Sequence, residues 1–228
     1  GQVQAPGVFL NAVAILERQL AAFCLDNWVK TGVPESAISK NVKQMLDELD
    51  TGRKGGFPYN FLRYVQEHRV AIAERFAGIF PQLEADTLLQ LTHYLTGEQN
   101  YHSLEQRIDT ALAQLLEDRK SLRARIDKLK YSIEKLKAAP QDQNYEADLR
   151  EMTSERSALQ SLIRQINDKQ TLNFLTDEGL LPNYAFPEAG VTLRSVLWRR
   201  KKGGQEREFQ NTTYEYERPA ATALAELA

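Results

Sequence analysis

The chain has 228 residues, 42% of them hydrophobic and 26% charged, with a formal net charge of −2. This length suits one or two domains with cores of their own, and the balanced charge excludes binding to nucleic acid or a membrane surface through overall charge alone. No run approaches the roughly 20 apolar residues of a membrane span, and the N-terminus lacks the layout of a signal peptide. We therefore expect a cytoplasmic protein without membrane contact.

The two ends of the sequence indicate a segment of a longer protein. The chain begins with Gly1 rather than Met, and it stops at ALAELA, within an expected helix. Its one cysteine, Cys24, lies in the apolar run LAAFCLDNW, which excludes an internal disulfide and favours a buried thiol.

The first hundred residues predict a helical base. Residues 8–30 carry apolar side chains at helical spacing until Gly32 and Pro34 end the pattern, and residues 35–50 repeat it. After the loop TGRKGGFPYN, two further helices are expected at residues 59–78 and in the run LEADTLLQLTHYL. Residues 1–100 are therefore expected to form about four helices with short connections.

Residues 101–172 predict a long antiparallel coiled-coil hairpin. Apolar residues recur mostly at steps of four and three on both sides of Pro140 and the polar run QDQN, as in the seam between two helices. The seam positions are Leu104, Ile108, Leu112, Leu115, Leu122, Ile126, Leu129, Ile133 and Leu136, then Tyr145, Leu149, Met152, Leu159, Ile163 and Ile166.

The charges of the two predicted arms are complementary. Residues 117–137 hold eight Lys or Arg and four acids, whereas residues 142–168 hold three and six. Arg119 and Arg156 interrupt the apolar seam, where a basic side chain usually fixes the register or extends its charge to solvent. The short loop permits pairing within one chain or exchange between two chains.

Residues 173–228 form the third predicted region. A segment rich in Gly and Pro is followed by VTLRSVLWRR and REFQNTTYEYE, which flank the turn KKGGQE with alternating β-branched and aromatic residues. This pattern predicts a small C-terminal β-hairpin, and Pro219 is well placed at the start of a last helix. The expected fold class is thus mainly α.

No motif in the sequence predicts catalysis. The phosphate-binding pattern G-x-x-x-x-G-K-[ST] is missing, and the acidic run DELD at residues 47–50 lies on an amphipathic helix rather than after an apolar strand. His68, His93 and His102 are not spaced as metal ligands. We therefore expect no enzyme activity, no metal site and no cofactor in this segment.

One cluster of basic residues predicts contact with nucleic acid. Basic side chains beside an aromatic ring can hold phosphates and stack on an unpaired base, although a charged turn is also common at the tip of a hairpin. The cluster comprises Arg194, Trp198, Arg199, Arg200, Lys201, Lys202 and Arg207. The basic outer face of residues 119–137 is a second candidate.

Three stretches resemble a known family. PGVFLNAVAILERQLAAFCLD, NFLTDEGLLPNYAFP and YERPAATALAELA are similar to the region that follows the ATPase motor in very large bacterial DEAD/DEAH-box (superfamily 2) helicases of the phage-defence and DNA-repair type. The resemblance implies a parent that is an ATP-dependent helicase using ATP and magnesium. The motor motifs and the cysteine cluster of such proteins are missing from this chain.

Two functions remain in competition. The chain can be an accessory region of such a helicase, with the rest of the helicase and DNA as partners. Alternatively, the coiled coil docks another protein or oligomerises without touching nucleic acid, which predicts an outer apolar stripe to which Leu116 and Tyr131 would belong. The sequence does not choose between DNA and RNA or between single and double strands.

Overall fold

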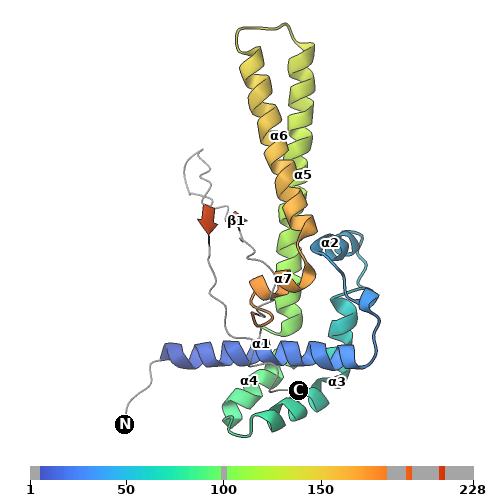
Figure 1. Cartoon of the computed structure of the whole chain (residues 1–228), viewed down its shortest axis with the longest axis vertical. Helices are drawn as coiled ribbons and strands as arrows, with labels where there is room; N and C mark the ends of the chain where they lie inside the picture. The colour runs from blue at the N-terminus through green and yellow to red at the C-terminus, as the bar shows by residue number, and fades with distance from the viewer. Residues whose placement is uncertain (1–5, 99–101, 184–193, 197–210, 214–228) are drawn as a thin grey trace. The chain divides into compact units, whose positions relative to one another are not determined.

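The protein is mainly helical, as its sequence predicts. The chain divides into two compact units, Gly1–Pro182 and Asn183–Ala228. No helix in the described residues is both long and apolar enough to cross a membrane. The computed structural model describes residues 6–98, 102–183, 194–196 and 211–213, with only the backbone described for residues 6–12 and the last two ranges (Figure 1).

Four α-helices form the base of the first unit. Most of them follow the predicted spans. The prediction of one helix over residues 35–50 is wrong, because this stretch forms the 3-10 turn Glu35–Ala37 and a separate, shorter α-helix. Asn41 is the N-cap of this shorter helix. Its backbone is extended and its side chain accepts a hydrogen bond from the Gln44 amide, so the α-helix begins only at the next residue. The helices are α1 (Pro6–Lys30), α2 (Val42–Asp50), α3 (Tyr59–Ile79) and α4 (Ala85–Thr96).

The core of the base lies where α1, α3 and α4 pack together. Trp28 contacts Phe57 and Phe61, with ring centroids 6.1 and 5.6 Å away. Leu20 of α1 is almost fully buried, and Ile72 of α3 is fully buried. Burial of such side chains is the main stabilising contribution to a helical base.

Two long helices rise from the base and lie side by side (Figure 1). Helix α5 (Leu104–Ala138) starts at a capping box made by Ser103 and Gln106, and α6 (Tyr145–Asp168) returns after a short connection. The helices are antiparallel, since Arg119 bonds Asn167 while Arg125 bonds Glu155 further from the base. Residues 120–166 of this pair form the arm.

The arm has a small apolar core of its own. Ile126, Leu129 and Leu159 are buried together, and further apolar residues of both helices pack against them. Apart from Leu162, these residues occupy positions that the four-and-three spacing predicts to face the neighbouring helix. The partly buried residues are Leu122, Met152, Leu162 and Ile163.

The lower part of α5 departs from the predicted seam. Leu116 is buried, with only 7% of its surface exposed, whereas Leu115 is half-buried. Helix α5 contacts α2 and α4 of the base as well as α6, so α6 alone does not set its buried face. The expectation that Leu116 faces outward is therefore wrong.

The remaining described elements lie after α6. Helix α7 (Thr171–Asp177) buries Phe174 and Leu175 in the first unit. In the second unit, strand β1 (Arg194–Val196) pairs antiparallel with β2 (Asn211–Thr213). Because the turn KKGGQE lies outside the described residues, the complete β-hairpin stays a prediction.

The buried environment of Cys24 predicts an unreactive thiol. Burial raises its pKa to about 12, and the thiolate is the reactive species. We expect Ellman's reagent to label the native protein only as fast as it unfolds, and to label it at once in denaturant. As a control, Cys24→Ala/Tyr131→Cys should react rapidly in the native state, because Tyr131 is 59% exposed. Equal labelling rates for the two native proteins would contradict this assignment.

Candidate nucleic-acid interface

The basic cluster predicted from the sequence cannot be placed in space. Arg194 lies in β1, where only the backbone is described, and the rest of the cluster lies outside the described residues. The structure therefore neither brings these side chains together nor separates them. They are Trp198, Arg199, Arg200, Lys201, Lys202 and Arg207.

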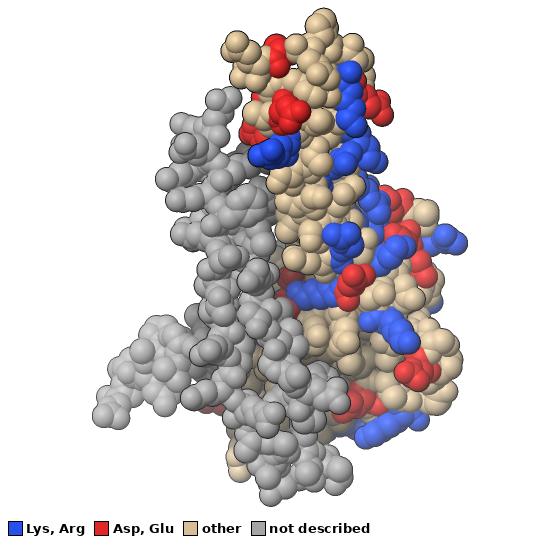
Figure 2. Space-filling model, turned by 45° about the horizontal axis from the view of Figure 1, so that its top comes forward, with Lys and Arg blue, Asp and Glu red and all other residues tan. Residues whose placement is uncertain are grey.

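The second predicted candidate, the basic face of α5, is described. Residues 120–137 carry seven Lys or Arg and two acids, whereas residues 142–155, which belong mainly to α6, carry one base and five acids. The space-filling view shows blue side chains along one edge of the arm and red ones near its end (Figure 2). The excess of positive charge of the arm therefore lies on α5, and the acids of α6 lie mainly toward the far end of the arm.

One ion pair joins the two helices across the arm. Arg125 donates from Nε to Glu155 Oε1 at 2.8 Å and from Nη2 to Oε2 at 3.1 Å, a two-bond arrangement that fixes both side chains. The hydrogen bonds that Arg125 donates to Glu155 raise the pKa of Arg125, which keeps the guanidinium charged. The positive charge of Arg125 is thereby neutralised locally.

The other cations of α5 differ in whether a residue nearby neutralises or covers their charge. Lys120 lies 3.2 Å from Asp50 of α2, and the Lys135 ammonium lies 4.8 Å from the centre of the Tyr131 ring. Within the described part of the chain, no ion pair is found for Arg123, Lys128 or Lys137. Among the described residues, α5 thus carries positive charges that no ion pair neutralises.

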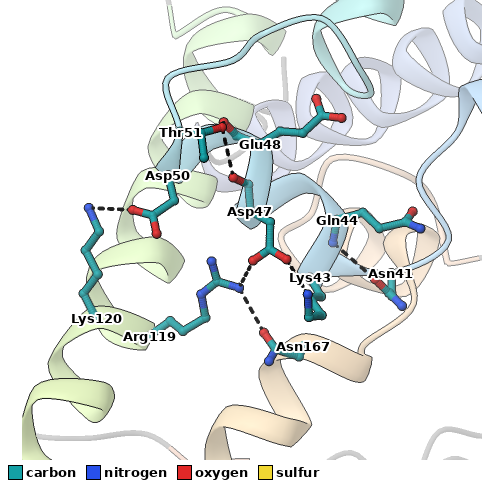
Figure 3. Close-up of polar contacts among 10 residues, drawn as sticks. All are labelled: Asn41, Lys43, Gln44, Asp47, Glu48, Asp50, Thr51, Arg119, Lys120 and Asn167. Carbon is teal, nitrogen blue, oxygen red and sulfur yellow. Dashed lines mark hydrogen bonds and ion pairs between the residues drawn. The ribbon is translucent and has the colours of Figure 1, made fainter. Parts of the chain in front are cut away.

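Arg119 fixes the root of the arm (Figure 3). Its side chain is fully buried, and Nη1 donates to Asp47 Oδ1 of α2 at 2.9 Å and to Asn167 Oδ1 of α6 at 3.1 Å. Its Nε and Nη2 atoms find no hydrogen-bond partner among the described residues. The sequence suggests that Arg119 either fixes the register of the helices or extends its charge to solvent. The buried side chain, bonded to two other helices, agrees with the first role and not with the second.

Asp47 is held in its ionised form by this arrangement. Its partial burial raises the pKa, but hydrogen bonds from Lys43 and Arg119, together with their positive charges, outweigh that effect and lower the pKa overall. The acidic run DELD therefore has a structural role here: Asp47 binds Arg119 and Asp50 binds Lys120.

Helix α2 is itself tied to the end of α6. The Val42 amide donates to the Lys169 carbonyl at 2.9 Å, and the Thr171 amide donates to the Lys40 carbonyl at 3.2 Å. These bonds flank an antiparallel bridge between Asn41 and Gln170. The carboxylate that pairs with Arg119 is thus positioned by the same segment that ends α6.

Sequence reasoning did not find Asp47 and Asn167 as partners of Arg119. Asp47 lies 72 residues before Arg119, and no local pattern links the two positions. The only available signal was the break in the apolar seam at Arg119, because a buried cation requires a buried or nearby counter-charge.

Comparisons with known proteins add no relative: no family model, no curated protein and no solved structure matches this chain. In the described residues, no three His, Cys, Asp or Glu side chains gather as metal ligands would.

Removal of the Asp47 carboxylate is expected to destabilise the first unit. Asp47→Ala leaves Arg119 buried beside Asn167 alone, and we expect a loss of about 2 kcal/mol in the free energy of unfolding, measured by urea denaturation at pH 7. The matched change Asp26→Ala alters an exposed acid of α1 and should cost less than about 0.5 kcal/mol. In an Arg119→Met background, Asp47→Ala should cost little, and an unchanged cost there would contradict the pairing.

The same pair predicts a pH dependence. Because the folded protein lowers the pKa of Asp47, its contribution is fully present above the unfolded value of about 3.9 and is lost as the pH falls through the folded pKa. The stability difference between the wild type and Asp47→Ala should therefore shrink in urea titrations below about pH 4. A difference that stays constant down to pH 2 would contradict ionisation of Asp47 as its source.

Proposed function

We propose that this chain is a non-catalytic, DNA-engaging region of a large ATP-dependent DNA helicase, built around a rigid coiled-coil arm. The observation that supports DNA contact is the excess of positive charge on the α5 side of the arm. Cations of α5 outnumber its acids seven to two over residues 120–137, and only part of them pair with acids in the described residues. A polyanion is the partner that such a surface attracts.

The arm has the dimensions and stiffness to carry such a contact away from the base. The part of α5 that belongs to the arm, residues 120–138, corresponds to about 28 Å at 1.5 Å per residue. We propose that the apolar contacts around Ile126, Leu129 and Leu159 continue as the seam of an antiparallel coiled coil. An arm of this kind can guide a strand or press against a duplex while the base stays attached to the motor.

The helicase parent is proposed from the resemblance of the three stretches described above. In such a parent, ATP and magnesium belong to the motor, and this segment supplies positioning rather than hydrolysis. A role in phage defence or DNA repair is proposed on the same resemblance. The basic cluster around Arg199–Lys202 is proposed as a further DNA contact.

The alternative is a coiled-coil module that binds another protein. It requires an apolar outer stripe, yet Leu116 is buried. In the described arm, Tyr131 is the large hydrophobic residue that is exposed, and Lys135 lies over its ring. A single aromatic ring offers far less apolar surface than a docking helix needs, so the described arm favours a charged partner.

DNA binding by the whole chain is the first expectation to test. Fluorescence anisotropy with a labelled duplex and a labelled single strand should show binding that weakens steeply between 50 and 200 mM salt, because phosphate contacts release counterions. Changing Arg199, Arg200, Lys201 and Lys202 together to Ala should weaken that binding if the predicted cluster contributes. No binding with protein at about 50 μM in low salt would remove DNA as a partner and leave the protein-binding module.

A further inference from the structure

Three basic side chains form a row along one side of α5. Arg123, Lys130 and Lys137 are seven residues apart, which is two helical turns, so all three lie on the same side of the helix. Successive members are about 10.5 Å apart along the axis, and the row extends over roughly 21 Å. All three side chains are exposed.

This side of α5 is not neutralised by α6. The ion pair across the arm uses Arg125, which lies on another side of α5, and no ion pair in the described residues joins the row to α6. Lys130 lies 3.9 Å from Asp127 of its own helix, but both side chains are more than half exposed, and such pairs contribute little. The row therefore keeps most of its positive potential.

The row is backed by the apolar core of the arm. Ile126, Leu129 and Ile133 are buried in the stretch of α5 that carries the row, each with 6% or less of its surface exposed. The helix is consequently fixed against its neighbour before any ligand arrives. A preorganised row loses less conformational freedom on binding than the same charges on a flexible chain.

The chemistry of the row indicates which ligand it takes. Binding of single strands generally uses aromatic side chains on which bases stack, and the nearest described ring, Tyr131, is covered on one face by Lys135. Two Lys and one Arg at fixed spacing instead present point charges to phosphates, without the groove contacts that read sequence. A duplex offers a phosphate charge every 1.7 Å or so along a stiff axis.

We propose that Arg123, Lys130 and Lys137 bind the phosphate backbone of duplex DNA without regard to its sequence, so that the arm contacts the duplex through one defined side. This inference rests on the proposed function and adds to it the ligand class and the contact residues. The basic cluster at residues 194–207 would act separately from the row.

The test compares two variants that remove the same charge from the same arm. The row variant carries Arg123→Gln, Lys130→Gln and Lys137→Gln. The control variant carries Lys128→Gln, Lys135→Gln and Arg150→Gln, which removes one Arg and two Lys from exposed positions outside the row. Circular dichroism should show equal helix content and similar melting temperatures for both, because all six positions are exposed.

Binding is measured on the full chain with two 24-base-pair duplexes of unrelated sequence, a 24-residue oligothymidine, and polyglutamate as competitor. The wild type should bind both duplexes alike and more tightly than oligothymidine. The row variant should bind the duplexes at least about tenfold more weakly, and its slope of log K against log salt should fall by about 2.7, as three lost phosphate contacts require. The control variant should change by less than about threefold, because its charges lie further from the phosphates.

Each other result has a distinct meaning. If the wild type binds duplexes but the row variant binds equally well, or if both variants lose the same affinity, the row is not the contact and DNA engagement itself stands. Tighter binding to oligothymidine would overturn the duplex assignment. Equally tight binding of polyglutamate would assign the row to an acidic protein instead. If the wild type binds no DNA, the proposed function fails together with the row.

Discussion

The burial of one guanidinium group, that of Arg119, is the constraint on which the arrangement of the long helices depends. A buried cation is expensive to remove from water unless charge and hydrogen bonds compensate it. Arg119 is fully buried and finds Asp47 on α2 and Asn167 on α6. Three helices must therefore meet at one point, and that point is where α5 passes from packing on the base to packing on α6.

The surroundings of Arg119 support the same geometry. Backbone hydrogen bonds between Val42 and Lys169, and between Thr171 and Lys40, hold the start of α2 against the segment after α6. Asp47 lies on α2 and Asn167 lies on α6, so these backbone hydrogen bonds position both partners of the guanidinium group. A network of this kind specifies one arrangement more strongly than apolar packing, which tolerates sliding of helices past each other.

Beyond Arg119, the apolar and the charged side chains of the arm have different roles. Its apolar residues are used in packing, and its charges are distributed unequally between α5 and α6. The chain's net charge of −2 conceals this local asymmetry, because acids elsewhere in the chain offset the bases of α5 in the total. Electrostatic attraction of a ligand depends on the local field near the surface, since salt screens charges beyond about 8–10 Å. A nearly neutral protein can thus present a strongly basic edge.

The sequence by itself determined the helical class, most helix spans and the burial of Ile126, Leu129 and Leu159, because the spacing of apolar residues is a local property of a helix. It could not determine where α2 begins, why Leu116 is buried, or which acid compensates Arg119. Those features depend on contacts between residues far apart in the chain, such as Asp47 and Arg119. The predicted nucleic-acid cluster at residues 194–207 lies almost wholly outside the described residues, whereas the basic face of α5 could be assessed. Only the tertiary structure decided which of its cations are neutralised, because an ion pair forms only where two helices bring opposite charges within a few ångströms.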